Sequence, residues 1–407
     1  MSVLSGKKIL LGVTAGIAAY KSSYLVRLFV KAGAEVKVVM TPAAKDFVTP
    51  LTLSTLSKNP VVSSFYDKDQ DNELWNSHVE LALWADLMLI APLTANTMAK
   101  MTEGVCDNLL MATYLSAKSD VYFAPAMDLD MYQHDTTRKN IETLTERGHK
   151  MIPPGTGELA SGLEGEGRMA EPEDIFRFIE DDIRSGLPLL GKKVLITAGP
   201  TYEAIDPVRF VGNHSSGKMG YSLAQEAARL GAHVYLISGP TSLPVEHSGI
   251  ERINVVSAEE MYQATHRYVD DMDIAIFSAA VSDFRPKTVS AEKIKKAKDA
   301  DQHMTLELVR TKDILASVGK IKKRGQFIVG FALETENEFE NARSKMTEKN
   351  LDMIVLNSLR DKGAGFKSDT NKISILVSDG RVIDFELKVK EEVAEDIFNE
   401  IIKNIHA

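Results

Sequence analysis

The order of apolar and polar positions at the start of the chain predicts a strand, a helix and a second strand. Residues 9–13 are apolar and run into a Thr14-Ala15-Gly16 turn, and the segment that follows is amphipathic with helical spacing. Gly33 ends this segment, and the β-branched residues 36–40 predict the second strand. The residues expected on one face of the helix are Tyr20, Tyr24, Leu25, Leu28 and Phe29.

A later stretch repeats this opening. Residues 191–199 are similar to residues 6–16, and they also precede an amphipathic segment, a glycine and a strand at 234–238. Two such openings about 185 residues apart predict two α/β domains, each Rossmann-like with three layers and a mainly parallel sheet. We expect one domain at residues 1–187 and a second domain at 188–407, joined at a short Gly/Pro break.

Further apolar segments extend both sheets. In the first half, strands are expected at 87–91 and 121–124, with helical patterns between 95 and 117. In the second half, the expected strands are 274–277, 327–331 and 353–356, and the expected helices lie near 258–270, 313–323 and 337–349. The tail differs, because an Asp379-Gly380 turn between 373–377 and 382–387 predicts a β-hairpin, followed by a helix from about 389.

Composition narrows the class of protein. The chain has 407 residues, of which 44% are hydrophobic and 26% charged, so the sequence is that of a globular protein of two or three domains. A net charge of -9 argues against general binding to nucleic acid or anionic membranes. The single cysteine, Cys106, excludes an intrachain disulfide and a Cys-rich zinc site, and it fits a reducing compartment. We therefore expect a cytoplasmic protein, since no apolar run approaches the ~20 residues that span a bilayer.

Loops that follow the expected strands are the candidate binding positions, because ligands of open α/β sheets lie at the carboxyl ends of strands. The loop 14–17 and the loop 91–97 each place hydroxyls or small residues at a helix start. Such loops are equally well explained as a tight turn with ordinary helix capping or as a phosphate site.

Three other motifs have a simple structural interpretation. His78 lies beside an apolar stripe, where histidines are usually structural. Asp128-Leu129-Asp130 lacks nearby partners that would complete a metal site. Residues 212–218 fit GxxxxGK, but Met219 stands where a P-loop requires Ser or Thr, so we retain anion binding and reject a P-loop ATPase.

A run of lysines follows Asp283. Lys287, Lys293 and Lys295 belong to it, and such runs are usually solvated faces. The alternative is a lid that closes over a triphosphate. Lys345 and Lys349 support this alternative, because their spacing of four places them on one helix face after a later strand.

These motifs together resemble, over essentially the whole chain, the bifunctional phosphopantothenoylcysteine decarboxylase/phosphopantothenate-cysteine ligase family of coenzyme A biosynthesis. In the first half the similarity lies in the segments 16–21, 77–81, 91–96 and 125–127. In the second half it lies in the segments 196–201, 206–209, 213–220, 279–283 and 292–296. Residues 213–220, Asn-His-Ser-Ser-Gly-Lys-Met-Gly, form the most specific of these matches.

For the first half, the resemblance implies an FMN-dependent decarboxylase with a flavoprotein-type fold that assembles as trimers. His78 would be its active-site histidine. Flavin would oxidise the cysteinyl thiol so that the carboxylate can leave, and reduced flavin would then return a hydride. The implied cofactor-binding residues are Thr14, Ala15, Gly16, Ile17, Thr41, Phe47, Thr94, Ala95 and Asn96.

Two catalytic positions depart from the family pattern. Asp128 stands where the family has an asparagine that holds the substrate carboxylate, and Ser161 stands where it has a cysteine that donates a proton. A serine hydroxyl is a far weaker acid than a thiol. We interpret the two changes as subfamily variation, with two alternatives: an oxidative decarboxylase that releases the enethiol, and a flavin-binding module without turnover.

For the second half, the resemblance implies a ligase that uses CTP and Mg²⁺ to activate 4'-phosphopantothenate as an acyl-cytidylate, which cysteine then attacks. Asn213, Arg209 and Lys293 would be catalytic. The implied nucleotide-binding residues are Phe277, Ser278, Ala279, Asp283, Lys293, Lys312, Asp313, Ile314, Leu315, Phe331, Lys345 and Lys349. Ligase domains of this family dimerise, so trimers linked through dimers would give a dodecamer.

Overall fold

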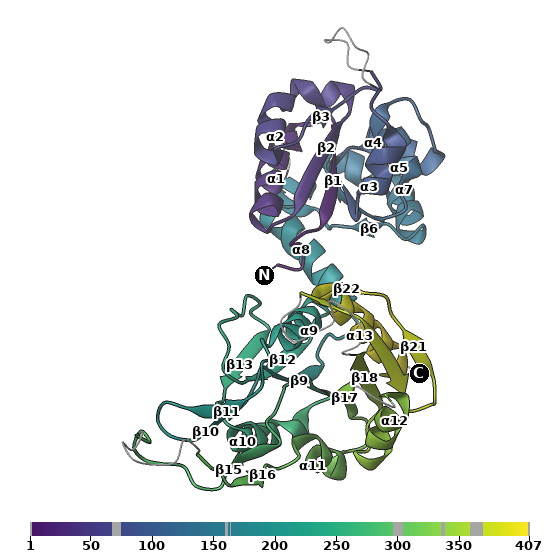
Figure 1. Ribbon diagram of the computed structural model, residues 1–407. Helices are drawn as coiled ribbons and strands as arrows, with labels where there is room; N and C mark the ends of the chain where they lie inside the picture. Colours follow the sequence, from purple (N-terminus) through teal and green to yellow (C-terminus); the bar gives the residue numbers. More distant parts are fainter. Residues whose placement is uncertain are drawn as a thin grey trace. The chain divides into compact units, whose positions relative to one another are not determined.

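The computed structural model describes residues 2–66, 75–158, 162, 164–295, 304–334, 338–358 and 369–405. The chain forms two compact units, Met1–Ser185 and Gly186–Ala407, which are both visible in Figure 1. This division falls two residues before the expected one at 187/188. Each unit is an α/β structure built around its own parallel sheet.

The first unit contains a parallel sheet made of apolar strands. In the part of the chain that the structure describes, six strands follow the order β3-β2-β1-β4-β5-β6. The side chains of β4 are buried throughout, as expected for a parallel strand covered on both faces. These strands are β1 (Lys8–Val13), β2 (Glu35–Met40), β3 (Val61–Val62), β4 (Leu87–Leu93), β5 (Asp120–Pro125) and β6 (Lys150–Met151).

Helices cover both faces of this sheet (Figure 1). One core cluster joins the sheet to α1, α2 and α8, and another joins its opposite face to α4, α5 and α7. The helices are η1 (Ile17–Lys21), α1 (Ser22–Lys31), η2 (Pro42–Asp46), α2 (Pro50–Ser57), α3 (His78–Trp84), α4 (Ala95–Glu103), α5 (Leu109–Ser116), α6 (Leu129–Gln133), α7 (Asp135–Glu146) and α8 (Pro172–Ser185). Because β1 lies between β2 and β4, the loops after β1 and β4 border the crevice where such sheets bind ligands.

The second unit repeats the arrangement with a longer sheet. Within its described residues, the strand order is β13-β12-β9-β14-β17-β18-β20-β21, and the last two strands are antiparallel to their neighbours. Its strands are β9 (Lys193–Ala198), β12 (His233–Ser238), β13 (Ile250–Asn254), β14 (Ile274–Phe277), β17 (Phe327–Glu334), β18 (Met353–Ser358), β20 (Ile373–Val377) and β21 (Val382–Asp384). The α/β class and the mainly parallel sheets predicted from the sequence are thus confirmed.

Two helices, α9 (Lys218–Arg229) and α13 (Lys390–Ile405), pack on one face of this sheet. The opposite face carries α10 (Ala258–Tyr268), α11 (Ile314–Ile321) and α12 (Glu338–Glu348), and η3 (Val269–Asp271) follows α10. The expected helix from about residue 389 is α13. The strand expected at 382–387 is shorter and ends at Asp384.

Short two-stranded antiparallel sheets form a second class of strands that the apolar pattern does not predict. They pair β7 (Gly155–Glu158) with β8 (Glu164–Arg168), β10 (Tyr202–Ala204) with β11 (Phe210–Gly212), β15 (Phe284–Pro286) with β16 (Leu308–Arg310), and β19 (Thr370–Asn371) with β22 (Lys388–Val389). Their strands are two to five residues long, and β8 has the sequence Glu-Gly-Glu-Gly-Arg, without apolar alternation.

The prediction of which residues form the apolar face of the first helix is wrong in part. Leu25 and Phe29 are fully buried, but Tyr20 is 49% exposed and Tyr24 is 58% exposed. The chain does not form one continuous helix there, because residues 17–21 wind as a 3₁₀ helix before α1 begins. Tyr20 therefore lies in a segment of different pitch, and Tyr24 lies on the exposed side of α1.

Candidate active sites

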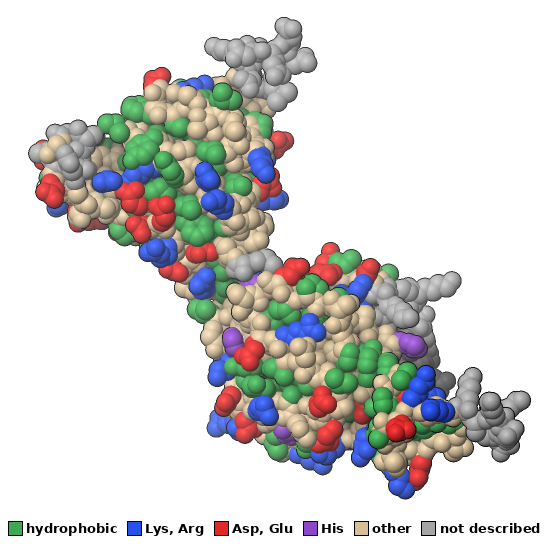
Figure 2. All heavy atoms as spheres, turned by 90° about the vertical axis from the view of Figure 1, so that its left-hand side faces the viewer, with side chains coloured by type: hydrophobic (Ala, Val, Ile, Leu, Met, Phe, Trp, Pro, Cys, Tyr) green, Lys and Arg blue, Asp and Glu red, His purple; other side chains and the backbone are tan. Residues whose placement is uncertain are grey.

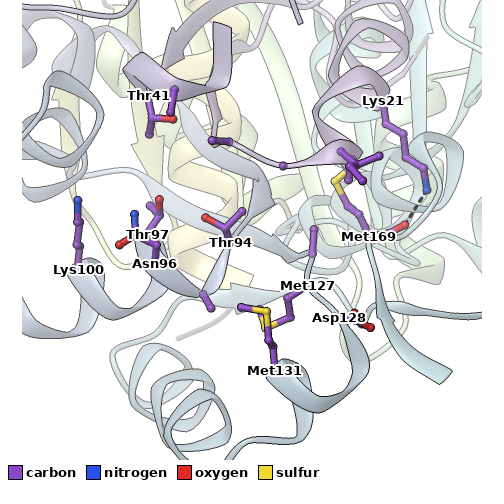
Figure 3. A pocket seen from close by; sticks show the side chains of 18 of the residues that line it. Lys21, Thr41, Thr94, Asn96, Thr97, Lys100, Met127, Asp128, Met131 and Met169 are labelled. Atoms are coloured by element: carbon purple, nitrogen blue, oxygen red, sulfur yellow. Dashed lines mark hydrogen bonds between the residues drawn. The ribbon is translucent and has the colours of Figure 1, made fainter. Parts of the chain in front are cut away.

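A cavity of about 850 Å³ opens at the carboxyl ends of the strands in the first unit. Its volume lies within the ~300–1,000 Å³ typical of small-molecule sites. Figure 3 shows the side chains that line it, including Thr41, Thr94, Asn96, Met127 and Asp128. They come from loops after four strands and from β8: residues 15–18 follow β1, 41–43 follow β2, 94–97 follow β4, 126–128 follow β5, and 167–169 end the hairpin.

Thr14 connects the loop after β1 to the loop after β4 by hydrogen bonds. Its hydroxyl donates to the carbonyl oxygen of Pro92 at 2.7 Å and accepts from the backbone N–H of Thr94 at 3.2 Å. Thr14 is fully buried and does not line the cavity, in contrast to its expected contact with the cofactor. These bonds fix the loops after β1 and β4 relative to each other, so that the backbones of both loops line the cavity.

The wall next to Thr94 carries the features of an anion site. Helix α4 begins at Ala95 without a side-chain cap, so the amides of its first turn lack that usual partner. Gly16 approaches closely, since a Cβ atom there would lie 3.4 Å from Cγ2 of Thr94. Uncapped amides at a helix start attract phosphate.

A second polar group faces the same cavity. The Thr41 hydroxyl is buried and has no hydrogen-bond partner among the described residues. A buried hydroxyl without a partner costs free energy unless a ligand satisfies it. Methionines form the apolar part of the wall: Met127, Met131 and Met169 (Figure 3). The uncapped amides at the start of α4, the Thr41 hydroxyl and the apolar wall fit a phosphorylated aromatic group such as FMN.

Charges at the cavity are compensated. Lys21 is 3% exposed, and its Nζ donates to the Met169 carbonyl at 2.8 Å, drawn dashed in Figure 3, and to Glu171 at 2.9 Å. The Lys21 hydrogen bond lowers the pKa of the Glu171 carboxyl below its ordinary value. Arg168 also pairs with Glu171, so one carboxylate joins η1 to the end of the hairpin.

The structure places the other predicted residues of this unit as follows. Ala15, Gly16, Ile17, Thr41, Thr94, Ala95, Asn96 and Asp128 line the cavity. Phe47 and His78 do not, and Ser161 lies outside the described residues. Phe47 is 45% exposed at the end of η2.

Asp128 and His78 have distinct surroundings. Asp128 caps α6, and its Oδ1 accepts from the Leu129 amide at 2.8 Å. His78 is the first residue of α3, its Nδ1 is buried without a partner among the described residues, and its ring meets that of Phe65 edge-on. One copy of the chain therefore does not bring His78 into the cavity.

Sequence reasoning missed part of the cavity wall. Lys100, Met131, Arg168 and Met169 line it and were not predicted as site residues. Lys100 lies in the helix after β4, just beyond the predicted loop 91–97, so the strand-end rule carried one turn further would have found it. The apolar pattern gave no signal for the hairpin residues, because Gly- and Glu-rich strands have no apolar alternation.

In the second unit, the loops after β9 and β14 and the start of α9 are tied together. Asn213 follows β11, and its side-chain amide donates to the carbonyl oxygens of Ala280 at 3.0 Å and Val281 at 3.2 Å. Ser278 donates to the Thr197 carbonyl at 2.7 Å. The structure thus brings the predicted Asn213 next to the strand-end segment 278–281.

Arg209 lies at the end of the turn before β11. Its guanidinium pairs with Asp206 and donates to the Ile294 carbonyl at 2.9 Å. Lys293, the residue before Ile294, is exposed. Arg209 and Lys293, both predicted as catalytic, therefore belong to one connected group.

The predicted nucleotide-binding residues divide into surface and core positions. Lys312 pairs with Glu259 at 2.8 Å, and Lys349 pairs with Asp313, the N-cap of α11, at 2.8 Å. Asp283 is exposed, whereas Ala279, Leu315 and Phe331 are half-buried and pack against the cores. Lys345 lies on α12, the helix that precedes Lys349.

Two of these predictions need correction. The side chains of Phe277 and Ile314 are 7% and 4% exposed and lie in the core beside α10 and α11. Any contact that they make with a nucleotide would come from backbone atoms. The family resemblance implied Phe277 as a nucleotide-binding residue, but its side chain lies in the sheet core.

The described ranges contain no group of three or more His, Cys, Asp or Glu side chains arranged to hold a metal ion. Over those ranges, every helix is too short or too polar to cross a bilayer.

Both halves of the chain match known families. The profile of the family described as "Flavoprotein" matches residues 2–184. The profile described as "DNA/pantothenate metabolism flavoprotein C-terminal domain" matches residues 189–405.

Relatives that match most of this chain are named either as a decarboxylase or as a bifunctional protein of coenzyme A biosynthesis. A protein named Cysteine/Cysteine sulfinic acid decarboxylase, from an unknown prokaryotic organism, is 52% identical over 363 residues, which cover 88% of this chain and all of that protein. The Coenzyme A biosynthesis bifunctional protein CoaBC of Vibrio parahaemolyticus is 45% identical over 98% of this chain and 99% of its own. The CoaBC protein of Bacillus subtilis is 45% identical over 98% of this chain and 97% of its own.

Solved structures match each half separately. The C-terminal domain of a CoaBC protein is 42% identical, covers 54% of this chain and 99% of its own, and has a TM-score of 0.46. A phosphopantothenoylcysteine (PPC) decarboxylase mutant complexed with pantothenoylaminoethenethiol is 34% identical, covers 44% of this chain and 98% of its own, and has a TM-score of 0.39.

Proposed function

Because this chain belongs to the family of bifunctional coenzyme A biosynthesis proteins CoaBC, with a flavoprotein half and a ligase half, we propose that it performs both reactions in sequence. The second unit joins cysteine to 4'-phosphopantothenate with CTP and Mg²⁺, and the first unit decarboxylates the product to 4'-phosphopantetheine with FMN. The main support for the flavin-dependent reaction is the cavity of the first unit, where α4 begins without a side-chain cap and the Thr41 hydroxyl has no partner among the described residues.

The residues around α4 would hold the FMN phosphate. The backbone amides of Ala95 and Asn96 lie at the helix start, where the helix dipole favours an anion. Thr41 would donate to a polar edge of the flavin, and Met127, Met131 and Met169 would pack against its rings. Bound flavin supplies an electron acceptor for the substrate thiol and later returns the electron pair.

The decarboxylase site requires a second copy in this proposal. His78 lies outside the cavity of its own chain, so we assign it to the cavity of a neighbouring copy. Figure 2 looks onto the side of the first unit on which α1 and α2 lie, where hydrophobic side chains spread over the upper body. Tyr24 and Leu51, exposed residues of α1 and α2, support an association there. Trimers of this unit and dimers of the second, giving a dodecamer, remain our proposal.

The ligase site would use the group around Asn213. A carboxylate is a poor acyl donor, so attack by cysteine needs prior activation as an acyl-cytidylate. Asn213 lies beside the segment 278–281 and would bind this intermediate, while Arg209 and Lys293 would neutralise phosphate charge. Lys312, Lys345 and Lys349 would hold the nucleotide phosphates, and Asp313, which pairs with Lys349 at 2.8 Å, would position that lysine.

The direct test supplies purified protein and FMN with phosphopantothenate, cysteine, CTP and Mg²⁺, and identifies products by mass. We expect 4'-phosphopantetheine. Accumulation of phosphopantothenoylcysteine would leave only the ligase, as the alternative of a non-catalytic flavin module requires. A product two hydrogens lighter would indicate the enethiol-releasing alternative that Ser161 suggests. The proposed cytoplasmic location agrees with the single cysteine.

A second candidate function is decarboxylation of free cysteine. It is favoured by the 52% identical relative named a cysteine decarboxylase and by Asp128 at the cavity. Free cysteine keeps an α-ammonium group, which a carboxylate attracts, whereas the cysteine of phosphopantothenoylcysteine has lost that charge to an amide. Cysteamine and CO₂ formed from cysteine and FMN-loaded protein, faster than phosphopantothenoylcysteine is consumed, would favour this reading.

A further inference from the structure

Asp206 accepts more hydrogen bonds than its own turn requires. Its Oδ1 accepts from the amides of Val208 and Arg209, both at 2.8 Å, and these two bonds close the turn. Its Oδ2 accepts from Nε of Arg209 at 3.0 Å and from the amide of Ile294 at 3.2 Å. Ile294 lies 88 residues further along the chain, so one carboxylate joins the turn to a distant segment.

Two more bonds complete this connection. Arg209 donates to the carbonyl oxygen of Ile294 at 2.9 Å, and the amide of Ser290 donates to the carbonyl oxygen of Ile205 at 3.0 Å. Ile294 is thus held through both its amide and its carbonyl. Lys293 precedes it directly, so the backbone position of this exposed lysine is set by the bonds on the next residue.

The same turn is rigidly linked to Asn213. Arg209 leads into β11, which pairs with β10 and ends at Gly212, the residue before Asn213. The rings of Tyr202 and Phe210 stack across this hairpin at 3.9 Å between centroids. Asp206 is 3% exposed, and its hydrogen bonds with the Arg209 side chain, and then those with backbone amides, hold its pKa well below the ordinary value. The carboxylate is therefore ionised at neutral pH.

We infer that Asp206 is a positioning residue of the ligase site: it fixes the Arg209 guanidinium and the segment that carries Lys293 relative to Asn213. This inference rests on the proposed ligase function. A role confined to the turn would need only Oδ1, whereas Oδ2 serves Arg209 and Ile294. Asp206 itself need not touch substrate.

The test compares Asp206→Asn with Glu226→Gln in the full-length protein. Glu226 is a matched control, because it is 7% exposed and binds Arg229, three residues ahead, through Nε and Nη2 at 2.7 Å, on α9 rather than at the site. Asparagine keeps the size of Asp206 but replaces an acceptor oxygen with an NH₂ group. Formation of the cysteine adduct should slow about tenfold or more in Asp206→Asn, as expected for lost charge-assisted hydrogen bonds, and should change less than about twofold in Glu226→Gln.

Two further measurements separate positioning from a general loss of structure. Adding Asp206→Asn to the double variant Arg209→Ala/Lys293→Ala should slow the residual reaction little further, because both side chains that Asp206 positions are then absent. Amide hydrogen exchange of residues 290–295 should speed up in Asp206→Asn, while that of β9 and β14 stays unchanged.

The outcomes are distinct. Equal rates in wild type and Asp206→Asn, a further multiplying loss from Asp206→Asn in the Arg209→Ala/Lys293→Ala background, or an equal loss in Glu226→Gln would each overturn the inference. If wild type itself releases no pyrophosphate from CTP with phosphopantothenate, the ligase proposal fails. Hydrogen exchange of residues 290–295 then still decides whether Asp206 holds that segment.

Discussion

Gly220 lies where α9 crosses β9, and the crossing leaves no room for a side chain. A Cβ atom there would lie 2.5 Å from Cβ of Ala198 and 2.8 Å from Oγ of Ser278. Gly220→Ala should therefore lower the free energy of unfolding by about 1–3 kcal/mol, the usual cost of overpacking. Urea denaturation of the whole protein measures the change. Gln225→Ala on the same helix, at a half-buried position, is the control, and equal losses in both variants would contradict the packing argument.

Glu171 gives the first unit a specific response to acid. Its pKa is lowered by the Lys21 hydrogen bond, so the ion pair is fully present above the unfolded pKa of ~4.3 and is lost as pH falls through the lower folded value. Glu171 is half exposed, which limits the contribution to about 1 kcal/mol or less. Urea midpoints of wild type and Glu171→Gln should differ at pH 7, and the difference should shrink as pH falls below the unfolded pKa of ~4.3. A difference that stays constant over this fall in pH would be inconsistent with the linkage.

Among elements, the loops after β1 and β4 act as one unit through Thr14. Thr14→Val keeps the shape of the side chain but removes the hydroxyl that binds the Pro92 carbonyl and the Thr94 amide. The free energy of unfolding should fall by about 1–3 kcal/mol. The displaced loop should weaken FMN binding by roughly tenfold or more, measured by quenching of flavin fluorescence.

Thr113→Val is the matched control for this prediction. Thr113 is also fully buried, but its hydroxyl donates to the Leu109 carbonyl inside α5, at 2.8 Å. Its substitution should leave FMN affinity within about twofold of wild type, since an intrahelical hydroxyl bond contributes little. Equal FMN affinities in Thr14→Val and wild type would show that the two loops hold their positions independently.

The sequence predicts those elements in which the apolar side chains are buried and the polar side chains are exposed. Strand β4 and helix α13 each have a continuous apolar pattern, and both lie where expected. Hairpins β7–β8 and β10–β11 are held by backbone pairing and by contacts distant in sequence, such as Tyr202 with Phe210. No local pattern carries that information, so the site residues on these hairpins could not be predicted from spacing.

The same distinction applies to site residues. Ala15, Gly16 and Thr94 line the cavity because they follow strands, which the sequence reveals. Phe277 also ends a strand, but its side chain alternates into the core, and only the register of β14 decides this. The family resemblance correctly gave the two halves of the chain, whereas His78 cannot be placed by a single copy.

At the scale of the whole molecule, the two units have separate cores. The core clusters around α1 and α5 contain residues of the first unit, and those around α9 and α10 contain residues of the second. We therefore expect two unfolding transitions in calorimetry. FMN at 100 times its dissociation constant should stabilise one transition by about 2.7 kcal/mol, and CTP should shift the other. A single transition that both ligands shift equally would refute independent units.

Cys106 offers a further consequence. It is the one thiol in the sequence, it is exposed, and it precedes Asp107 and Asn108, which line the cavity. A maleimide dye should therefore attach once per chain without any mutagenesis, and its emission should fall as flavin fills the neighbouring space. The native protein thus carries its own labelling site, with which flavin occupancy could be followed in real time.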